Sequence, residues 1–311
     1  MNQPAMAGAN SHARWVVWTA GLVLPLLLLF FWFDPWGWRQ ALTIKTIALQ
    51  RDLHRDLAQA VRLTAQGDNW AGWILIATSF VYGVFHAVGP GHGKVVISTY
   101  LATQDRSIKS ALLLTNLAAL MQGAVALAVV AVALWVLQQT ARAAQEWTGQ
   151  LEIFSFACIT GIGVYLAYRG ARKWFTRNSG HHQGCGHHHH HHGPADQAGF
   201  WSTLVATGIR PCSGGILVLI LAVSLGLWWH GALAVLAMSI GTGITVSILA
   251  VLVVTARGRA MELAATLTRT ETHLAALSSL LAFVGGVLLI AFGISLIDGA
   301  LATAEHPLMR R

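Results

Sequence analysis

Two histidines inside an apolar stretch are the residues best suited to chemistry. His86 and His92 lie within a predicted membrane span over 71–102. An ionisable side chain at such depth is costly and is a functional candidate by default. Two imidazoles suit nickel, cobalt, zinc or copper, and they argue against magnesium or calcium. On an unbroken α-helix, however, residues six positions apart lie about 120° off the same face and could not easily share one ion.

The residues between the two histidines predict a break in this helix. Gly89, Pro90 and Gly91 separate them. Proline removes a backbone donor and blocks the helix, and the flanking glycines allow the chain to turn. The break could bring both imidazoles to one point and leave backbone carbonyls beside them. We therefore predict His86 and His92 as metal ligands, with a structural hydrogen bond as the alternative for His86.

A second interruption lies in another predicted span, over 201–226, at Arg210–Gly215. Cys212 is expected to be a soft auxiliary ligand or a small packing residue. A thiol–disulfide relay would need a second cysteine at the matching position, which Gly91 occupies. Lys94 and Arg210 are the charges nearest the breaks: they could repel or gate a cation, pair with helix-end carbonyls, or snorkel to an interface. The predicted pathway and gating residues are Gly89, Pro90, Gly91, Lys94, Gln122, Arg210, Pro211, Ser213 and Thr242.

Further metal ligands lie in a low-complexity segment between the two interruptions. The predicted accessory metal-binding residues are His181, His182, Cys185, His187, His188, His189, His190, His191 and His192. Such tracts bind late divalent metals. The segment has no apolar anchors and is expected to be disordered without a ligand, so it cannot impose a coordination geometry. We interpret it as a metal collector or sensor and not as the transport site.

These residues must be positioned by membrane helices. Hydrophobic residues make up 55% of the 311-residue chain and charged residues only 10%, against about 25% charged in soluble domains. Stretches long and apolar enough to cross about 30 Å of hydrocarbon are predicted at 15–33, 71–102, 110–137, 153–169, 201–226, 231–255 and 278–298. The first is interpreted as a retained signal anchor, because it is too long for a signal peptide and lacks a small-residue cleavage site. Residues 41–66 form an amphipathic helix, on the membrane surface or packed on the body, which we expect to be a spacer.

The predicted fold is an all-α polytopic membrane protein of about seven transmembrane helices. Its core is two inverted three-helix repeats, since both interrupted spans open a set of three. Paired Gly/Pro interruptions in inverted halves are a sequence indication of a transporter's binding site. The expected divisions are an anchor (1–38), an interfacial segment (39–70), the first repeat (71–177), a His-rich cytoplasmic loop (178–198), the second repeat (199–300) and a tail (301–311).

The net charge of +8 does not indicate nucleic-acid binding, because the basic residues lie in short segments between the spans. Membrane proteins use such residues to set their orientation. With 34–70 set aside, ten Lys and Arg fall on the predicted side of the N-terminus and three on the other. This bias favours a cytoplasmic N-terminus in a bacterial inner membrane, with lipid as the surrounding partner.

The interrupted segments resemble a known family. Tyr82–Lys94 and the Val-Val-Ile-Ser-Thr-Tyr-Leu that follows look like the signature of the NicO nickel/cobalt transporter superfamily, in its efflux (RcnA-like) branch. Ala119–Gln122 and Gly208–Gly214 resemble further blocks of that branch. The resemblance covers about 71–300 and implies a six-helix core, nickel or cobalt as substrate and export from the cytoplasm. Uptake permeases of the superfamily place an aspartate where this chain has Gly91, which favours the efflux branch.

The alternatives are an uptake permease and, less favoured, a membrane metal sensor. An intramembrane zinc peptidase would carry His-Glu-x-x-His, which the sequence lacks, so the chain is not expected to be an enzyme. No cofactor is expected beyond the transported Ni²⁺ or Co²⁺. The sequence leaves the coupling ion and the oligomeric state open, a homo-oligomer included.

Overall fold

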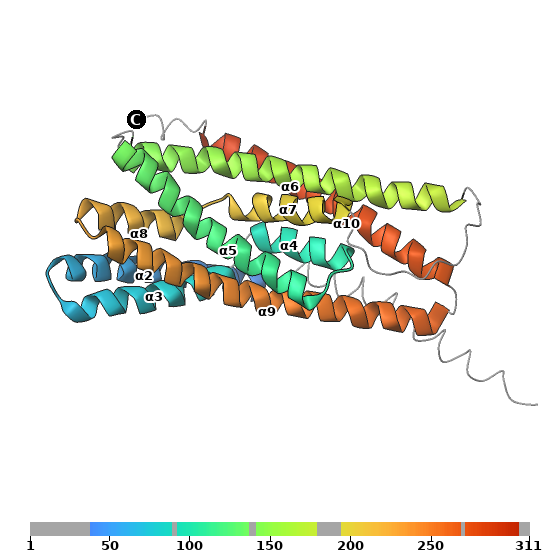
Figure 1. Ribbon diagram of the computed structural model, residues 1–311, viewed down its shortest axis with the longest axis horizontal. Helices are drawn as coiled ribbons and strands as arrows, with labels where there is room; N and C mark the ends of the chain where they lie inside the picture. Colours follow the sequence, from blue (N-terminus) through green and yellow to red (C-terminus); the bar gives the residue numbers. More distant parts are fainter. Residues whose placement is uncertain (1–37, 89–91, 137–140, 179–193, 269–270, 305–311) are drawn as a thin grey trace, which may run out of the picture.

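The structure is a computed structural model that describes residues 38–88, 92–136, 141–178, 194–268 and 271–304. These residues form helices joined by short turns, with no strand among them (Figure 1). The helices are α2 (Trp38–Ala65), α3 (Asn69–Val88), α4 (His92–Thr103), α5 (Ile108–Ala131), the short π-helix η1 (Val132–Val136), α6 (Ala141–Asn178), α7 (Pro194–Gly208), α8 (Ser213–Ser224), α9 (Trp228–Thr268) and α10 (Glu271–Ala304).

Five of these helices are long and apolar enough to cross a membrane. The membrane-crossing segments are Trp70–Val88, Ile108–Leu134, Trp147–Phe175, Trp228–Leu263 and Ser278–Leu301. α7 and α8, which are bent by 52° at their junction, pass the same test together and make a sixth crossing if the pair is one broken span. The predicted span over 15–33 lies outside the described residues, so the expected seventh crossing stays a prediction.

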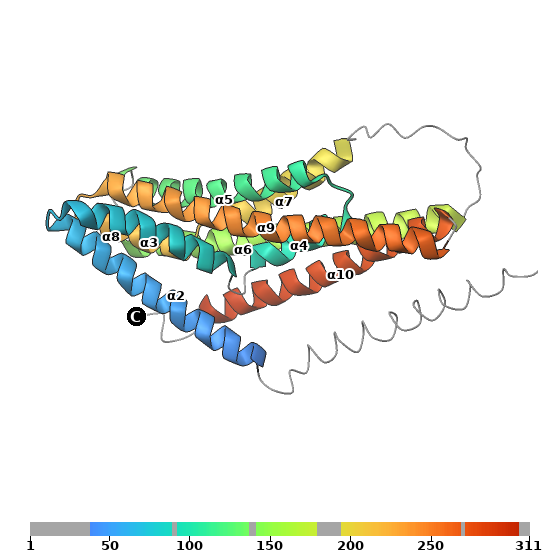
Figure 2. The same ribbon diagram turned by 90° about the horizontal axis from the view of Figure 1, so that it is seen from below.

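Both predicted interruptions appear as helix ends. α3 ends at Val88 and α4 begins at His92, while α7 ends at Gly208 and α8 begins at Ser213. The helix ends at both interruptions lie near mid-length of the bundle (Figures 1 and 2). The α2–α3 and α8–α9 turns lie at one end of the bundle and the α4–α5 turn at the other (Figure 1). These ends agree with the alternation of sides expected from the spans.

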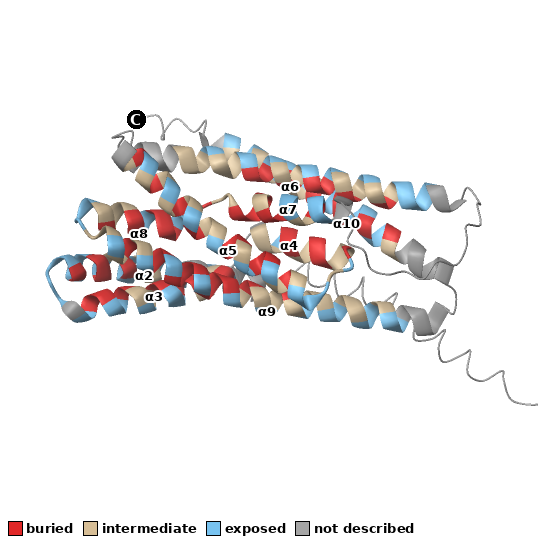
Figure 3. Ribbon diagram, viewed as in Figure 1, coloured by how far each residue is buried: buried red, intermediate tan, exposed pale blue. Residues whose placement is uncertain are grey.

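Close helix crossings depend on glycine. A Cβ on Gly83 of α3 would collide with the carbonyl oxygen of Met238 on α9, and one on Gly241 would collide with the carbonyl oxygen of Phe80. Gly163 of α6 and Gly286 of α10 meet in the same way. Small residues let backbones approach where lipid gives no hydrophobic drive for association. Buried residues therefore form inward stripes on the helices, with exposed apolar residues facing outward (Figure 3).

α2 takes the second of the two placements that the sequence left open for 41–66. It packs on the helical body, against α3 and α8, and is more than the spacer that was favoured. Leu57, Ala60 and Val61 are buried there in a cluster that includes Tyr82 and Met238. The apolar stripe of this helix is thus used against the protein and not against the membrane surface. From the α2–α3 turn, α2 diverges from the bundle toward Trp38 (Figure 2).

Two predicted spans were too short. α6 covers 38 residues around the predicted 153–169, and α9 covers 41 residues around the predicted 231–255. Hydropathy finds only the apolar part of a helix, whereas Ala, Met, Glu and Leu after residue 255 are strong helix formers. Arg257 in this extension donates a hydrogen bond of 2.8 Å to Asp105 beside the α4–α5 turn.

Candidate metal site

A cavity of about 210 Å³ lies between the two interruptions. Its walls come from α2 to α9, with α3 and α4 contributing from one interruption and α7 and α8 from the other. The predicted site residues that line it are His86, Lys94, Gln122, Arg210, Pro211, Cys212, Ser213 and Thr242. The fold thus brings residues more than a hundred positions apart in the sequence to one chamber.

His86 and Cys212, the two described side chains predicted as metal ligands, both line this cavity. His86 lies in the last turn of α3, and Cys212 is the N-cap residue of α8 with an extended backbone (φ −68°, ψ 126°). The Sγ atom of Cys212 lies 3.6 Å from the Sδ atom of Met238. Imidazole nitrogen beside sulfur is a donor combination for late, soft-binding metals and not for magnesium or calcium.

Other predicted ligands fall outside the described side chains. His92 is the first residue of α4, but its side chain, the residues 89–91 and the accessory segment 181–192 are outside the described part of the structure. Among the described residues, no group of three or more His, Cys, Asp or Glu side chains could hold a metal ion. The pair of His86 and Cys212 therefore needs a further donor, and His92 stays the predicted one.

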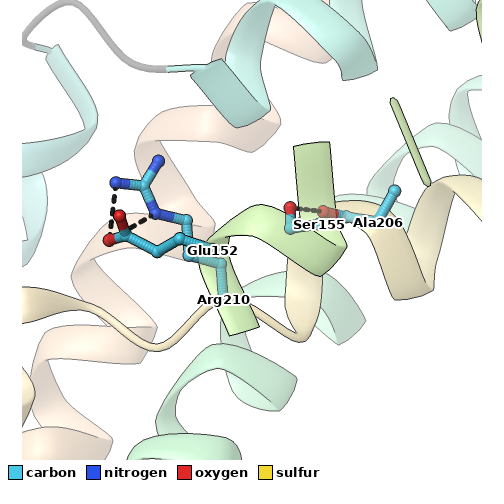
Figure 4. A network of polar contacts seen from close by, with 4 residues as sticks. All are labelled: Glu152, Ser155, Ala206 and Arg210. Atoms are coloured by element: carbon cyan, nitrogen blue, oxygen red, sulfur yellow. Dashed lines mark hydrogen bonds and ion pairs between the residues drawn. The ribbon is translucent and has the colours of Figure 1, made fainter. Parts of the chain in front are cut away.

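Arg210 is neutralised by a carboxylate that the sequence did not predict. Its Nε and Nη2 atoms donate hydrogen bonds of 3.0 and 2.9 Å to Oε1 of Glu152 on α6 (Figure 4). The guanidinium carbon also lies 5.3 Å from the ring centre of Phe156. The ion pair lies on the cavity wall, in the membrane-crossing part of α6.

Polar side chains around the cavity satisfy carbonyls at the second interruption. α7 ends at Gly208, so its last carbonyls lack helical partners. Ser155 of α6 donates to the Ala206 oxygen (Figure 4), and Gln122 of α5 donates to the Thr207 oxygen at 2.8 Å. At the α3–α9 crossing, Thr242 donates to the Gly83 oxygen at 3.1 Å. Gln122 and Thr242 are thus held by structural bonds while lining the chamber.

Sequence reasoning missed Glu152, Ser155 and Gln50 as cavity-lining residues. Glu152 immediately precedes the predicted span 153–169 and was not considered as a site residue. A usable indication was available: Arg210 in the middle of a predicted span requires a partner, since an unpaired charge there is costly. Gln50 was missed because α2 was expected to be a spacer.

Comparison with known proteins agrees with this architecture. The family model described as a high-affinity nickel-transport protein, NicO, matches residues 72–200 and 193–302. A Haemophilus influenzae protein named as a nickel/cobalt efflux system is 32% identical over 89% of this chain and 93% of its own length. The nickel/cobalt efflux systems RcnA of Shigella flexneri and Escherichia coli K12 are 26% identical over 40% of this chain, and the matches span 44% and 45% of their lengths. No solved structure matches the chain. Since the family model matches most of the chain, this membrane protein belongs to the NicO family of nickel and cobalt transporters.

Proposed function

We propose that this protein exports Ni²⁺ or Co²⁺ from the cytoplasm across the bacterial inner membrane. The observation that carries the proposal is the cavity between the two helix interruptions, which is lined by His86 from one interruption and Cys212 from the other. Binding near the midplane between broken helices is a recurrent transporter arrangement. The relatives named as efflux systems support the outward direction.

In this proposal, His86, His92 and Cys212 hold the ion during transport. A late divalent metal meets the His86 nitrogen and the Cys212 sulfur at the cavity wall, and His92 at the start of α4 supplies a second imidazole. Glu152 cancels the charge of Arg210, so that the guanidinium next to Cys212 does not repel the incoming cation. The accessory segment 181–192 raises the local metal concentration on the cytoplasmic side.

Labelled nickel in cells tests the direction of transport. Deleting the gene raises cellular nickel or cobalt if the protein exports the metal. A fall in cellular metal would show uptake instead, and no change in either metal would refute both directions. Flux of Ni²⁺ into or out of liposomes containing only the purified protein separates a transporter from a membrane metal sensor, because a sensor carries no flux.

A further inference from the structure

α2 contributes a polar side chain, Gln50, to the wall of the cavity, although this helix lies outside the segment that the family model matches. Most of its inward stripe is apolar, with Leu53, Leu57 and Val61 in the shared cluster with α3 and α8. Two polar residues one helical turn apart interrupt this stripe. Gln50 lines the cavity, and His54 follows four positions later on the same face. The polar residues of the stripe, Gln50 and His54, therefore lie at or within one helical turn of the cavity wall.

His54 is held in a specific contact with α3. Its Nε2 atom lies 2.8 Å from the hydroxyl oxygen of Tyr82, and the two rings stack with their centres 4.8 Å apart. The Tyr82 ring also stacks on His86 with centres 5.6 Å apart. The phenol ring is therefore in contact with an imidazole on the cavity wall and with an imidazole on α2.

Tyr82 fills this position tightly. It is 2% exposed, and a Cβ added to Gly214 of α8 would lie 2.6 to 2.7 Å from three atoms of its side chain. The ring is therefore closely packed where it contacts both imidazoles. Moving Tyr82 from this place requires its hydrogen bond to His54 on α2 to break.

We propose that His54 is a metal-binding residue of the transport path, which takes the ion from His86 and Cys212 when Tyr82 swings aside. The inference rests on the proposed function, because it assumes that His86 and Cys212 bind the ion first. The transfer is an exchange of ligands on a divalent late metal, and imidazole is a ligand suited to nickel and cobalt. Tyr82 is the gate between the two positions, and α2 is a working part of the transporter.

The test measures Ni²⁺ flux in proteoliposomes that contain the full chain, and compares the wild-type protein with variants at His54. His54→Gln keeps a side chain that can hydrogen-bond Tyr82 but removes the imidazole ligand. We expect its maximal flux to fall by about tenfold or more, while the KM for Ni²⁺ stays within about twofold, because the cavity ligands are unchanged. His54→Cys restores a metal ligand without the imidazole and recovers part of the flux. Elution as a single species in detergent shows that each variant is folded.

His230→Gln is the matched control. This histidine also packs against α3, where its ring lies 3.3 Å from the place of a Cβ on Gly72, and it does not line the cavity. We expect wild-type flux from it. Wild-type flux from His54→Gln would overturn the inference, as it would show that a hydrogen bond to Tyr82 is the whole role of His54. A raised KM, or no recovery in His54→Cys, would also overturn it.

A parallel His86→Ala variant separates this inference from the proposed function. If His86→Ala is inactive while His54→Gln behaves as wild type, only the role of His54 fails. If His86→Ala transports at the wild-type rate, the proposed site itself fails.

Discussion

The two helix interruptions are alike in position and different in chemistry. Between α3 and α4, the chain presents an imidazole, His86, and a lysine, Lys94, to the cavity. Between α7 and α8, it presents a thiol, Cys212, and an arginine, Arg210. The arginine pairs with a carboxylate, Glu152, and side chains donate to the open carbonyls of the neighbouring helix end. Similar helix interruptions thus bring different groups to the proposed site: an imidazole from the first, and a thiol beside an ion pair from the second.

The largest effects are expected when the predicted metal ligand of each interruption, His86 or Cys212, is replaced in turn. We expect His86→Ala to lower the apparent affinity for Ni²⁺ by about a hundredfold, or ~2.8 kcal/mol. Cys212→Ser should lower it by about tenfold, because hydroxyl oxygen is a harder ligand than thiolate. The measurement is concentration-dependent Ni²⁺ flux in proteoliposomes. Equal, small losses from both variants would contradict the difference between the two interruptions.

The ion pair at the second interruption gives the next largest effect. Glu152→Gln leaves the Arg210 guanidinium without its carboxylate on the wall of a cation site. We expect the KM for Ni²⁺ to rise about tenfold. The double change Glu152→Gln with Arg210→Gln should recover most of this loss, since it removes both charges. Such non-additivity is the signature of a coupled pair.

Failure of the double variant to improve on Glu152→Gln would show that the carboxylate acts otherwise than by cancelling Arg210. Arg55→Gln is the control. Arg55 pairs with Asp52 at 3.3 Å on the outer face of α2, where both side chains are mostly exposed. An exposed ion pair contributes little to stability, so the Ni²⁺ flux of Arg55→Gln should match that of the wild type.

Much of this comparison could be predicted from the sequence. Proline and glycine within apolar stretches gave the places of both interruptions, because their backbone chemistry acts locally. Glu152 as the partner of Arg210 and the seating of His54 on Tyr82 depend on which helices touch. Contacts between residues 28 or 58 positions apart are set by packing and carry no local pattern. The amphipathic stripe of 41–66 was visible, but a stripe alone does not say whether lipid or protein covers it.

A matched pair of glycine substitutions compares the packing behind the interruptions. Gly93 follows the first interruption, and a Cβ added to it would lie 3.9 Å from the nearest atom, on Thr207. Gly214 follows the second interruption, and a Cβ added to it would collide with the Tyr82 ring. We expect Gly214→Ala to destabilise the protein by about 1–3 kcal/mol through overpacking. Gly93→Ala should be neutral or stabilising by up to ~1 kcal/mol through helix propensity.

Apparent melting temperatures of the two glycine variants in detergent measure this difference. A melting temperature for Gly214→Ala equal to that of the wild type would show that the Tyr82 ring moves freely in the resting state. The tight gate inferred above would then be wrong.

The smallest predicted effect concerns the accessory segment. Deleting residues 181–192 should lower the transport rate or the metal sensitivity of cells by only a few-fold, because a tract without fixed geometry collects metal and does not conduct it. Nickel sensitivity of cells carrying the deletion measures this. Complete loss of transport would place the segment in the path itself and make the two interruptions insufficient.

Cobalt spectroscopy tests the central claim most directly, namely that the two interruptions bind one metal ion between them. The chain has three cysteines, so Cys158→Ser with Cys185→Ser leaves Cys212 as the sole thiol. Adding Co²⁺ to this purified variant in detergent should produce a thiolate-to-cobalt charge-transfer band in the near ultraviolet. The band should vanish with Cys212→Ser and shift with His86→Ala, since both residues bind the same ion. The account would be contradicted if the variant still transports Co²⁺ but shows no such band. It would also be contradicted if the band is unchanged by His86→Ala.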